Sequence, residues 1–140
     1  MEIVFLDSDV VISSLISKIG AAYYLLTHIE NINLHISNIS KSEIETVIER
    51  LSLPNEVFYS ILNNNLKVTA IDLMKIESVT QYVIDQGDAH IILGTRESHA
   101  RFLVSYNLKH YKTDKIKRDL GIIVISPGQF LQYLKSISVI

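Results

Sequence analysis

The sequence predicts an α/β fold of the three-layer, Rossmann-like kind, with a parallel sheet of about five strands covered by helices on both faces. Short apolar runs rich in β-branched residues alternate along the chain with segments whose apolar residues recur at helical spacing. Strands separated by helices are joined by right-handed crossovers and therefore run parallel in one sheet. The chain has 140 residues, a length that fits a single domain spanning 1–140 and is short for two.

The expected elements follow one another in a regular order. The strands are expected at 2–6, 34–37, 66–71, 102–105 and 121–125. Two helices are expected after the first strand, separated near Gly20, and two after the second strand, the later one starting at Pro54. Ser40 and Glu43 have the spacing of a capping box, which predicts that a helix begins there. Further helices are expected from Asp72 to about Ile84, from Asp88 through Ala100, and after a cap formed by residues 126–129.

The composition excludes several classes of protein. The chain has no cysteine, which excludes disulfides, thiolate zinc sites and thiol catalysis, so any metal must be bound by oxygen or imidazole. No apolar run approaches the roughly 20 residues needed to cross a bilayer, and the N-terminal residues lack the basic start of a signal peptide. We therefore expect a soluble, cytoplasmic protein that does not bind a membrane.

Polar residues gather where predicted strands end or the following helices begin; they are Asp7, Asp9, Glu43, Asp88 and Asn107. In open parallel sheets, ligands bind at the carboxyl ends of the strands, so these residues are the first candidates for a site. Each acid alone is also explained as a helix cap or a first-turn residue. Carboxylates that converge on one place repel one another unless a cation compensates them, and hard oxygen ligands favour Mg²⁺ or Mn²⁺.

The order of these motifs resembles the PIN-domain family over nearly the whole chain. FLDSDVVIS supplies Asp7, NISKSEIETVIERL supplies Glu43, GDAHIILGTRESHARFLVSYNLKHY supplies Asp88 and Asn107, and IIVISPGQFLQYL resembles the closing strand and helix. The resemblance implies a metal-dependent ribonuclease that hydrolyses RNA phosphodiester bonds, with Asp7, Glu43 and Asp88 as ligands of the metal. It also implies that hydrogen bonds from the surrounding polar residues orient these ligands; the residues expected to do so are Ser8, Asp9 and Ser105.

One position departs from the family pattern. Many PIN domains carry a fourth acid after the later strand, whereas this chain has Ser105-Tyr106-Asn107. The amide oxygen of Asn107 can still coordinate a metal or a metal-bound water, so we keep Asn107 among the catalytic residues. With one charge fewer, the site is expected to hold one cation tightly in place of two. The size of the chain resembles the toxin half of VapBC toxin–antitoxin pairs, which implies a small antitoxin protein as partner and a homodimer.

Basic residues are concentrated in one part of the chain, although the net charge is only −2. Six basic residues face a single acid within residues 101–118. Such a loop can follow an RNA backbone while Tyr106, His110 and Tyr111 stack on unpaired bases, but an ordinary solvated loop has the same composition. His90 and His99 show no metal-ligand spacing, and structural roles are expected for both. The predicted RNA-binding residues are Lys109, Lys112, Lys115, Lys117 and Arg118.

Other functions fit parts of the sequence. The D-x-D pattern at residues 7–9 is also the signature of haloacid-dehalogenase-like phosphatases, but the late paired-acid motif of that class is missing after Asp88. A receiver domain of two-component signalling requires a lysine after the fifth strand, where this chain has Ser126. A PIN-like domain that binds RNA or a protein without cleaving RNA stays open because Asn107 is neutral.

Overall fold

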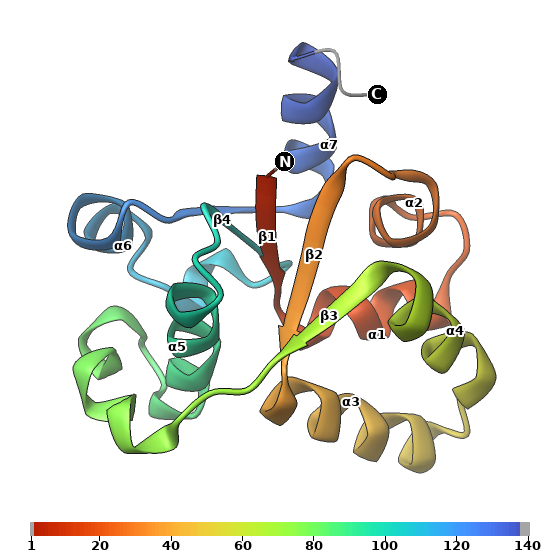
Figure 1. Ribbon diagram of the computed structural model, residues 1–140, viewed down its shortest axis with the longest axis horizontal. Coiled ribbons are helices and arrows are strands. Elements are labelled where there is room, and N and C mark those ends of the chain that lie inside the picture. Colours follow the sequence, from red (N-terminus) through yellow and green to blue (C-terminus); the bar gives the residue numbers. More distant parts are fainter. Residues whose placement is uncertain (1, 138–140) are drawn as a thin grey trace.

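The computed structural model describes residues 2–137 and contains one sheet of five parallel strands in the order β3-β2-β1-β4-β5 (Figure 1). The strands are β1 (Glu2–Leu6), β2 (Ile32–Ser37), β3 (Leu66–Thr69), β4 (Phe102–Val104) and β5 (Ile123–Ile125). From the central β1 the chain moves outward through β2 and β3, then returns to the other side of β1 to form β4 and β5. The strand order therefore reverses between β1 and β4, and this is where such sheets place their ligands.

Helices cover both faces of the sheet, as predicted. In Figure 1, α1 to α4 lie on one side of the sheet and α5 and α6 on the other. No single helix within residues 2–137 is long and apolar enough to span a membrane, and α1 and α2 meet such a criterion only when counted together as a bent pair. The α-helices are α1 (Ser8–Ile16), α2 (Ala21–His28), α3 (Asn38–Leu51), α4 (Asn55–Asn65), α5 (Ala89–Glu97), α6 (Thr113–Leu120) and α7 (Pro127–Ser136), and the 3-10 helices are η1 (Leu73–Ser78), η2 (Thr80–Tyr82), η3 (Gln86–Asp88) and η4 (Leu108–His110).

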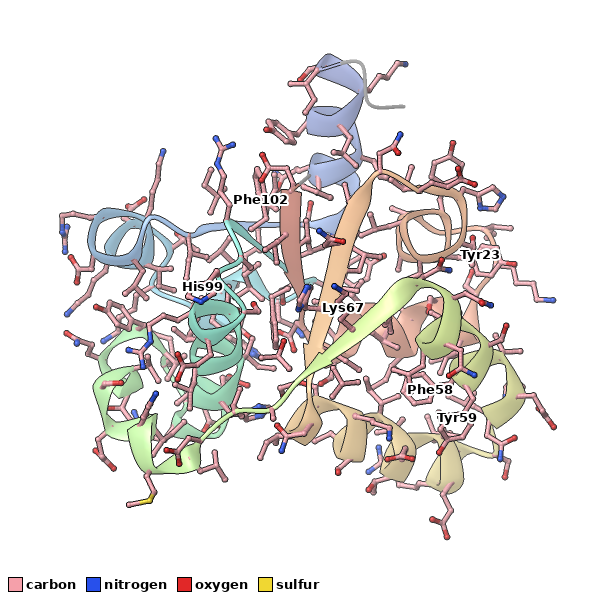
Figure 2. All side chains as sticks on the ribbon, in the orientation of Figure 1. Tyr23, Phe58, Tyr59, Lys67, His99 and Phe102 are labelled. Carbon is pink, nitrogen blue, oxygen red and sulfur yellow. The ribbon has the colours of Figure 1, made fainter. Side chains whose placement is uncertain are left out.

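Two apolar cores lie on the two faces of the sheet, because successive side chains of a strand point in opposite directions. In β1, Val4 and Leu6 belong to the core beneath α1 to α4, whereas Phe5 belongs to the core beneath α5. Phe58 of α4 and Phe102 of β4, both labelled in Figure 2, lie in the first of these cores. The three-layer α/β prediction is confirmed.

Helix α5 comes very close to the centre of the sheet. A Cβ atom placed on Gly94 of α5 would lie 2.5 Å from Cζ of Phe5, a separation that side chains do not tolerate. Phe5 is in β1, which leads directly into Asp7, and α5 follows directly after Asp88. The absence of a side chain at position 94 therefore allows α5 to bring Asp88, at its start, toward Asp7, at the end of β1.

We predict that Gly94→Ala lowers the free energy of unfolding, because the new methyl group forces the buried Phe5 ring to move. Overpacking of a well-packed core typically costs about 1–3 kcal/mol, which outweighs the gain of up to about 1 kcal/mol in helix propensity. Thermal unfolding measures the change. Gly128→Ala, where nothing lies within 4 Å of the added Cβ, is the matched control and should be neutral or stabilising. Equal stability of the two variants would contradict the close approach.

The predicted helix over residues 72–84 is wrong. This part of the chain forms the short 3-10 helices η1 and η2, and Leu73 at its start is 49% exposed. Val83 instead adopts an extended backbone and pairs in an antiparallel bridge with Tyr111. The bridge is extended by hydrogen bonds from the Ile84 nitrogen to the His110 carbonyl (3.0 Å) and from the Lys112 nitrogen to the Tyr82 carbonyl (2.9 Å).

Two helix boundaries also differ from the prediction. Helix α3 begins at Asn38 because the side chain of Ser37 accepts a hydrogen bond from the Ser40 nitrogen at 3.0 Å, so Ser40 and Glu43 do not form a capping box. Glu43 therefore lies in the second turn of α3. Helix α5 ends at Glu97, ahead of the predicted Ala100, and His99 takes a left-handed backbone conformation with φ of 60°. The predicted cap formed by residues 126–129 is confirmed as a complete capping box.

Candidate active site

The acids at the strand ends are not explained by helix capping. Asp7 precedes α1 and Asp88 precedes α5, yet neither side chain accepts a hydrogen bond from the helix that it opens. The nearby Asp85, in contrast, does cap its helix, since its Oδ1 accepts from the Gly87 nitrogen at 2.8 Å. Helix capping therefore does not explain why carboxylates occupy positions 7 and 88, and both side chains are candidates for a functional site.

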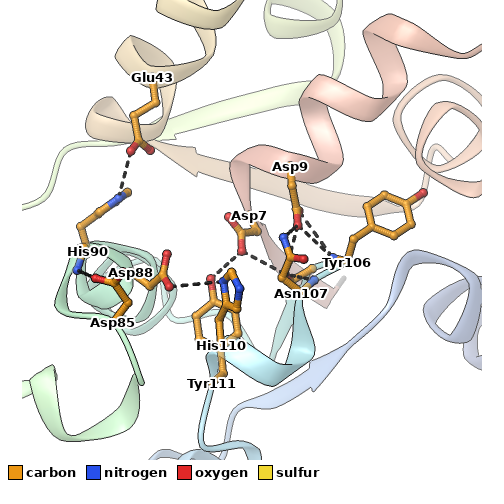
Figure 3. A network of polar contacts seen from close by, with 12 residues as sticks. Asp7, Asp9, Glu43, Asp85, Asp88, His90, Tyr106, Asn107, His110 and Tyr111 are labelled. Carbon is orange, nitrogen blue, oxygen red and sulfur yellow. Dashed lines mark hydrogen bonds and ion pairs between the residues drawn. The ribbon is translucent and has the colours of Figure 1, made fainter.

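Two buried hydroxyl groups hold the side chain of Asp7. Ser105, which follows β4, donates to Oδ2 of Asp7 at 2.9 Å, and Tyr111 donates to the same oxygen at 2.5 Å (Figure 3). Ser105 is fully buried and Tyr111 is 4% exposed. Burial raises the pKa of the Tyr111 hydroxyl above its usual value, and the charge of Asp7 raises it further, so the tyrosine remains a donor.

Asp9 lies beside Asp7 and receives donors from the loop after β4. The Asn107 side chain donates through Nδ2 to Oδ2 of Asp9 at 2.7 Å, and the Tyr106 nitrogen donates to the same oxygen at 3.2 Å. Burial, with the repulsion from Asp7 as the second cause, raises the pKa of Asp9 to about 7. The structure therefore brings Asp7, Asp9 and Asn107 together at the end of β1 and β4.

Asp88 approaches this group from the start of α5. Burial raises its pKa above the usual value, an effect that the neighbouring His110 opposes and Asp7 increases. Nδ1 of His110 lies 3.4 Å from Oδ2 of Asp88. Asp88 is therefore close enough to Asp7 for their charges to interact.

Glu43 stands apart from the three aspartates. Its Oε2 lies 3.4 Å from Nε2 of His90, and its Oε1 accepts from the Ser8 hydroxyl at 3.3 Å. The hydrogen bond from His90 is the main cause that lowers the pKa of Glu43. Figure 3 shows Glu43 reaching from α3 to His90 and away from Asp7. A structural role was expected for His90, and its side chain contacts Glu43, one of the predicted metal ligands. His99 lies after the opposite end of α5, away from this contact (Figure 2).

The predicted metal ligands fit a divalent cation in kind but not in their present arrangement. Within residues 2–137, no three histidine, aspartate or glutamate side chains are placed to bind one ion together. The carboxylates of Asp7, Asp9 and Asp88 are hard oxygen donors whose mutual repulsion a cation would relieve. A cation between Asp7 and Asp88 would include Glu43 only if that side chain left His90.

The predicted RNA-binding residues differ in their surroundings. Lys109, Lys112 and Lys117 are exposed, whereas Lys115 lies over the ring of Tyr82, with Nζ 5.7 Å from the ring centre. The last predicted residue, Arg118, contacts Asp119 at 3.4 Å.

Of the two tyrosines expected to stack on bases, only Tyr106 has an accessible ring. Tyr106 is 45% exposed and lies next to Asn107, whereas Tyr111 is buried against Asp7. The expectation that Tyr111 stacks on bases is therefore wrong, because its ring lies in the core beneath α5. An aromatic residue in a basic loop gives no sequence signal that separates these two outcomes.

Comparison with known proteins finds likeness in structure but not in sequence. No model of a known protein family matches the chain, and no curated protein matches it in sequence. Among solved structures, a chain from the crystal structure of VapBC2 from Rickettsia felis, bound to a DNA fragment from their promoter, is similar with a TM-score of 0.62 and 18% sequence identity. The match covers 89% of this chain and 98% of that chain. The fold of this protein is therefore shared with a chain of a VapBC complex.

Proposed function

We propose that this protein is a PIN-type, metal-dependent endoribonuclease that hydrolyses phosphodiester bonds of RNA. The observation that carries the proposal is the group formed by Asp7, Asp9 and Asp88 at the strand-order reversal of the sheet, where burial, and then the charge of Asp7, raise the pKa of both Asp9 and Asp88. The shared fold with a chain of a VapBC complex supports the same proposal.

In this proposal, Asp7 and Asp88 would hold a Mg²⁺ or Mn²⁺ ion, and Glu43 would be a further ligand if its side chain left His90. When bound, such an ion lowers the pKa of a coordinated water and offsets the negative charge that builds on the phosphate. Ser105 and Ser8 orient Asp7 and Glu43 through the hydrogen bonds described above. Asp9 and Asn107 are hydrogen-bonded to each other and border the site on the side of β4, where they are not counted among the ligands of the ion.

RNA is the substrate that best fits the surroundings of the site. Lys109 on η4 and Lys112 just before α6 are exposed and flank His110 and Tyr111, the two residues that contact Asp88 and Asp7. The exposed ring of Tyr106 offers a surface on which an unpaired base can stack. The stacking surface favours single-stranded RNA over a duplex, in which the bases are stacked on one another.

A partner protein is also part of the proposal. The structural neighbour is described as a VapBC complex bound to a DNA fragment from its promoter. We propose that this chain is the toxin of a toxin–antitoxin pair, that it forms a homodimer, and that a small antitoxin covers the acidic group. Co-expression with the product of the adjacent gene, followed by size-exclusion chromatography, tests the partnership.

A second candidate is a PIN-like domain that binds RNA without cleaving it. Two observations favour it: Asn107 is neutral, and Glu43 is held by His90 at a distance from the aspartates. This candidate predicts salt-sensitive RNA binding with no cleavage in any divalent metal.

The test of the proposed function is an RNA cleavage assay on the purified protein. We expect cleavage of single-stranded RNA with Mg²⁺ or Mn²⁺ and no cleavage in excess EDTA, because the acids need a cation for the chemistry. Single-stranded DNA and double-stranded RNA of the same sequence are the control substrates. Cleavage that continued unchanged in EDTA would refute the metal-dependent mechanism.

The exposed lysines should determine how strongly RNA binding depends on salt. Replacing Lys109, Lys112 and Lys117 with glutamine should weaken binding equally for all sequences, since phosphate contacts carry no sequence information. The slope of log affinity against log salt should fall by about 2, because each lost contact with a single strand removes about 0.7. Lys67 and Lys135, exposed on other elements, are the control pair. An unchanged slope in the triple variant would mean that these lysines belong to an ordinary solvated loop.

A further inference from the structure

Tyr111 joins two distant parts of the chain that carry the predicted acids. Its hydroxyl group donates to Oδ2 of Asp7 at 2.5 Å (Figure 3). Its backbone pairs with Val83, in the segment that leads to Asp88. The preceding residue, His110, reaches Oδ2 of Asp88 at 3.4 Å. Two consecutive residues therefore contact two of the acids at the candidate site, Asp7 and Asp88.

The side chain of Tyr111 has little freedom to move. The residue is 4% exposed, and the hydrogen bonds from Ile84 to His110 and from Lys112 to Tyr82 fasten its backbone on both sides. A side chain that is locked by packing and by its backbone can hold a neighbouring group in one geometry. The position of the Tyr111 hydroxyl group is therefore set by the packing of its own ring and backbone, independently of Asp7.

The two oxygens of Asp7 are in different situations. Both Tyr111 and Ser105 donate to Oδ2, and across residues 2–137 no hydrogen bond reaches Oδ1. The backbone of Asp7 is also held, since its nitrogen donates to the Val104 carbonyl at 2.9 Å. With the backbone and Oδ2 fixed, Oδ1 is the oxygen that remains for a ligand.

We propose that Tyr111 is a positioning residue of the candidate active site, which holds Oδ2 of Asp7 so that Oδ1 is presented to a divalent cation. The inference rests on the proposed function, because it needs a cation at Asp7. Outer hydrogen bonds that orient metal ligands typically contribute about 10–100-fold to metal affinity or activity.

The test compares two tyrosines that make the same kind of hydrogen bond. Tyr82 is also buried, and its hydroxyl donates to Oδ2 of Asp119 at 3.2 Å, away from the predicted ligands. Tyr111→Phe and Tyr82→Phe each remove one hydroxyl from a carboxylate and keep the ring. The melting temperature is measured in EDTA and across a series of Mn²⁺ concentrations, which gives the apparent Mn²⁺ affinity without any activity measurement.

We expect both variants to lose stability in EDTA, while only Tyr111→Phe weakens the apparent Mn²⁺ affinity, by about 10-fold or more. RNA cleavage by Tyr111→Phe should approach the wild-type rate at saturating Mn²⁺, because the variant weakens the hold on the cation and keeps every ligand. Wild-type Mn²⁺ affinity in Tyr111→Phe would overturn the inference.

The failure of this inference can be distinguished from the failure of the proposed function. If the wild-type protein itself neither responds to Mn²⁺ nor cleaves RNA, the proposed function falls, and the role of Tyr111 falls with it. If the wild-type protein responds and Tyr111→Phe responds equally, only the role of Tyr111 is lost. Should Tyr111→Phe not fold, Tyr111→Met, which fills the buried space without a hydroxyl group, takes its place: the same loss of Mn²⁺ affinity supports the inference, and an unchanged affinity overturns it.

Discussion

Asp7→Asn is expected to reduce Mn²⁺-dependent RNA cleavage by about 100-fold or more. Removing one carboxylate ligand takes away several kcal/mol of charge stabilisation, and each loss of about 1.4 kcal/mol lowers the rate tenfold. The fold should be unaffected, because the oxygen of an asparagine side chain can still accept the hydrogen bonds of Ser105 and Tyr111. Single-turnover cleavage at saturating Mn²⁺ measures the effect, and circular dichroism verifies the fold.

The other predicted ligands should respond in the same way. Asp88→Asn and Glu43→Gln are expected to reduce cleavage to a similar extent, if Glu43 moves to the cation in the active state. Asp85→Asn is the matched control, because Asp85 lies three residues before Asp88 but caps its helix, a task that asparagine performs equally well. Wild-type turnover in Asp88→Asn would show that the site has been assigned to the wrong residues.

Addition of Mn²⁺ is expected to raise the melting temperature of the wild-type protein by about 5–15 °C. An ion that binds only the folded state adds about 2.7 kcal/mol at a free concentration one hundred times its dissociation constant. In a domain of this size, each kcal/mol moves the midpoint by about 2–6 °C. Differential scanning calorimetry with Mn²⁺ and with EDTA measures the difference.

Asp7→Asn should change this response in a characteristic way. In EDTA the variant should melt at a higher temperature than the wild type, because the charge that repels Asp9 is gone, and it should gain much less from Mn²⁺. Asp119→Asn is the control, since Asp119 also accepts a tyrosine hydroxyl but lies outside the group of acids. If Asp7→Asn and the wild type melted alike and responded alike to Mn²⁺, the metal site would have to be abandoned.

The alternation of strands and helices could be predicted from the sequence because each element carries its own period of apolar residues. Residues 72–84 show where this reasoning fails. Leu73, Ile76, Val79 and Val83 fit helical spacing, but Val83 pairs with Tyr111 instead. A contact between residues so distant in the chain has no effect on the local pattern of apolar residues, so the local pattern could not exclude a helix.

The candidate site was predictable to a similar extent and for a similar reason. Asp7 follows from the rule that the ends of parallel strands meet at one edge, and Asp88 from its place at the start of a helix that connects two strands. In the structure the two are close enough for the charge of Asp7 to act on Asp88. Tyr111 was misjudged, and the contact of His90 with Glu43 was not predicted, because both depend on side-chain positions across the fold: Tyr111 is 104 residues from Asp7 in sequence. The separation of Glu43 from the aspartates was equally invisible, since it depends on a hydrogen bond with His90.

The contact between Gly94 and Phe5 makes the acidic group sensitive to a position that carries no charge. Gly94 lies six residues after Asp88, about 9 Å along the helix axis at the usual rise per residue. A side chain at position 94 would lift α5 from the sheet and carry Asp88 with it, unless residue 5 became smaller at the same time. We therefore expect residues 5 and 94 to change together during the evolution of related chains, so that the volume they share stays constant.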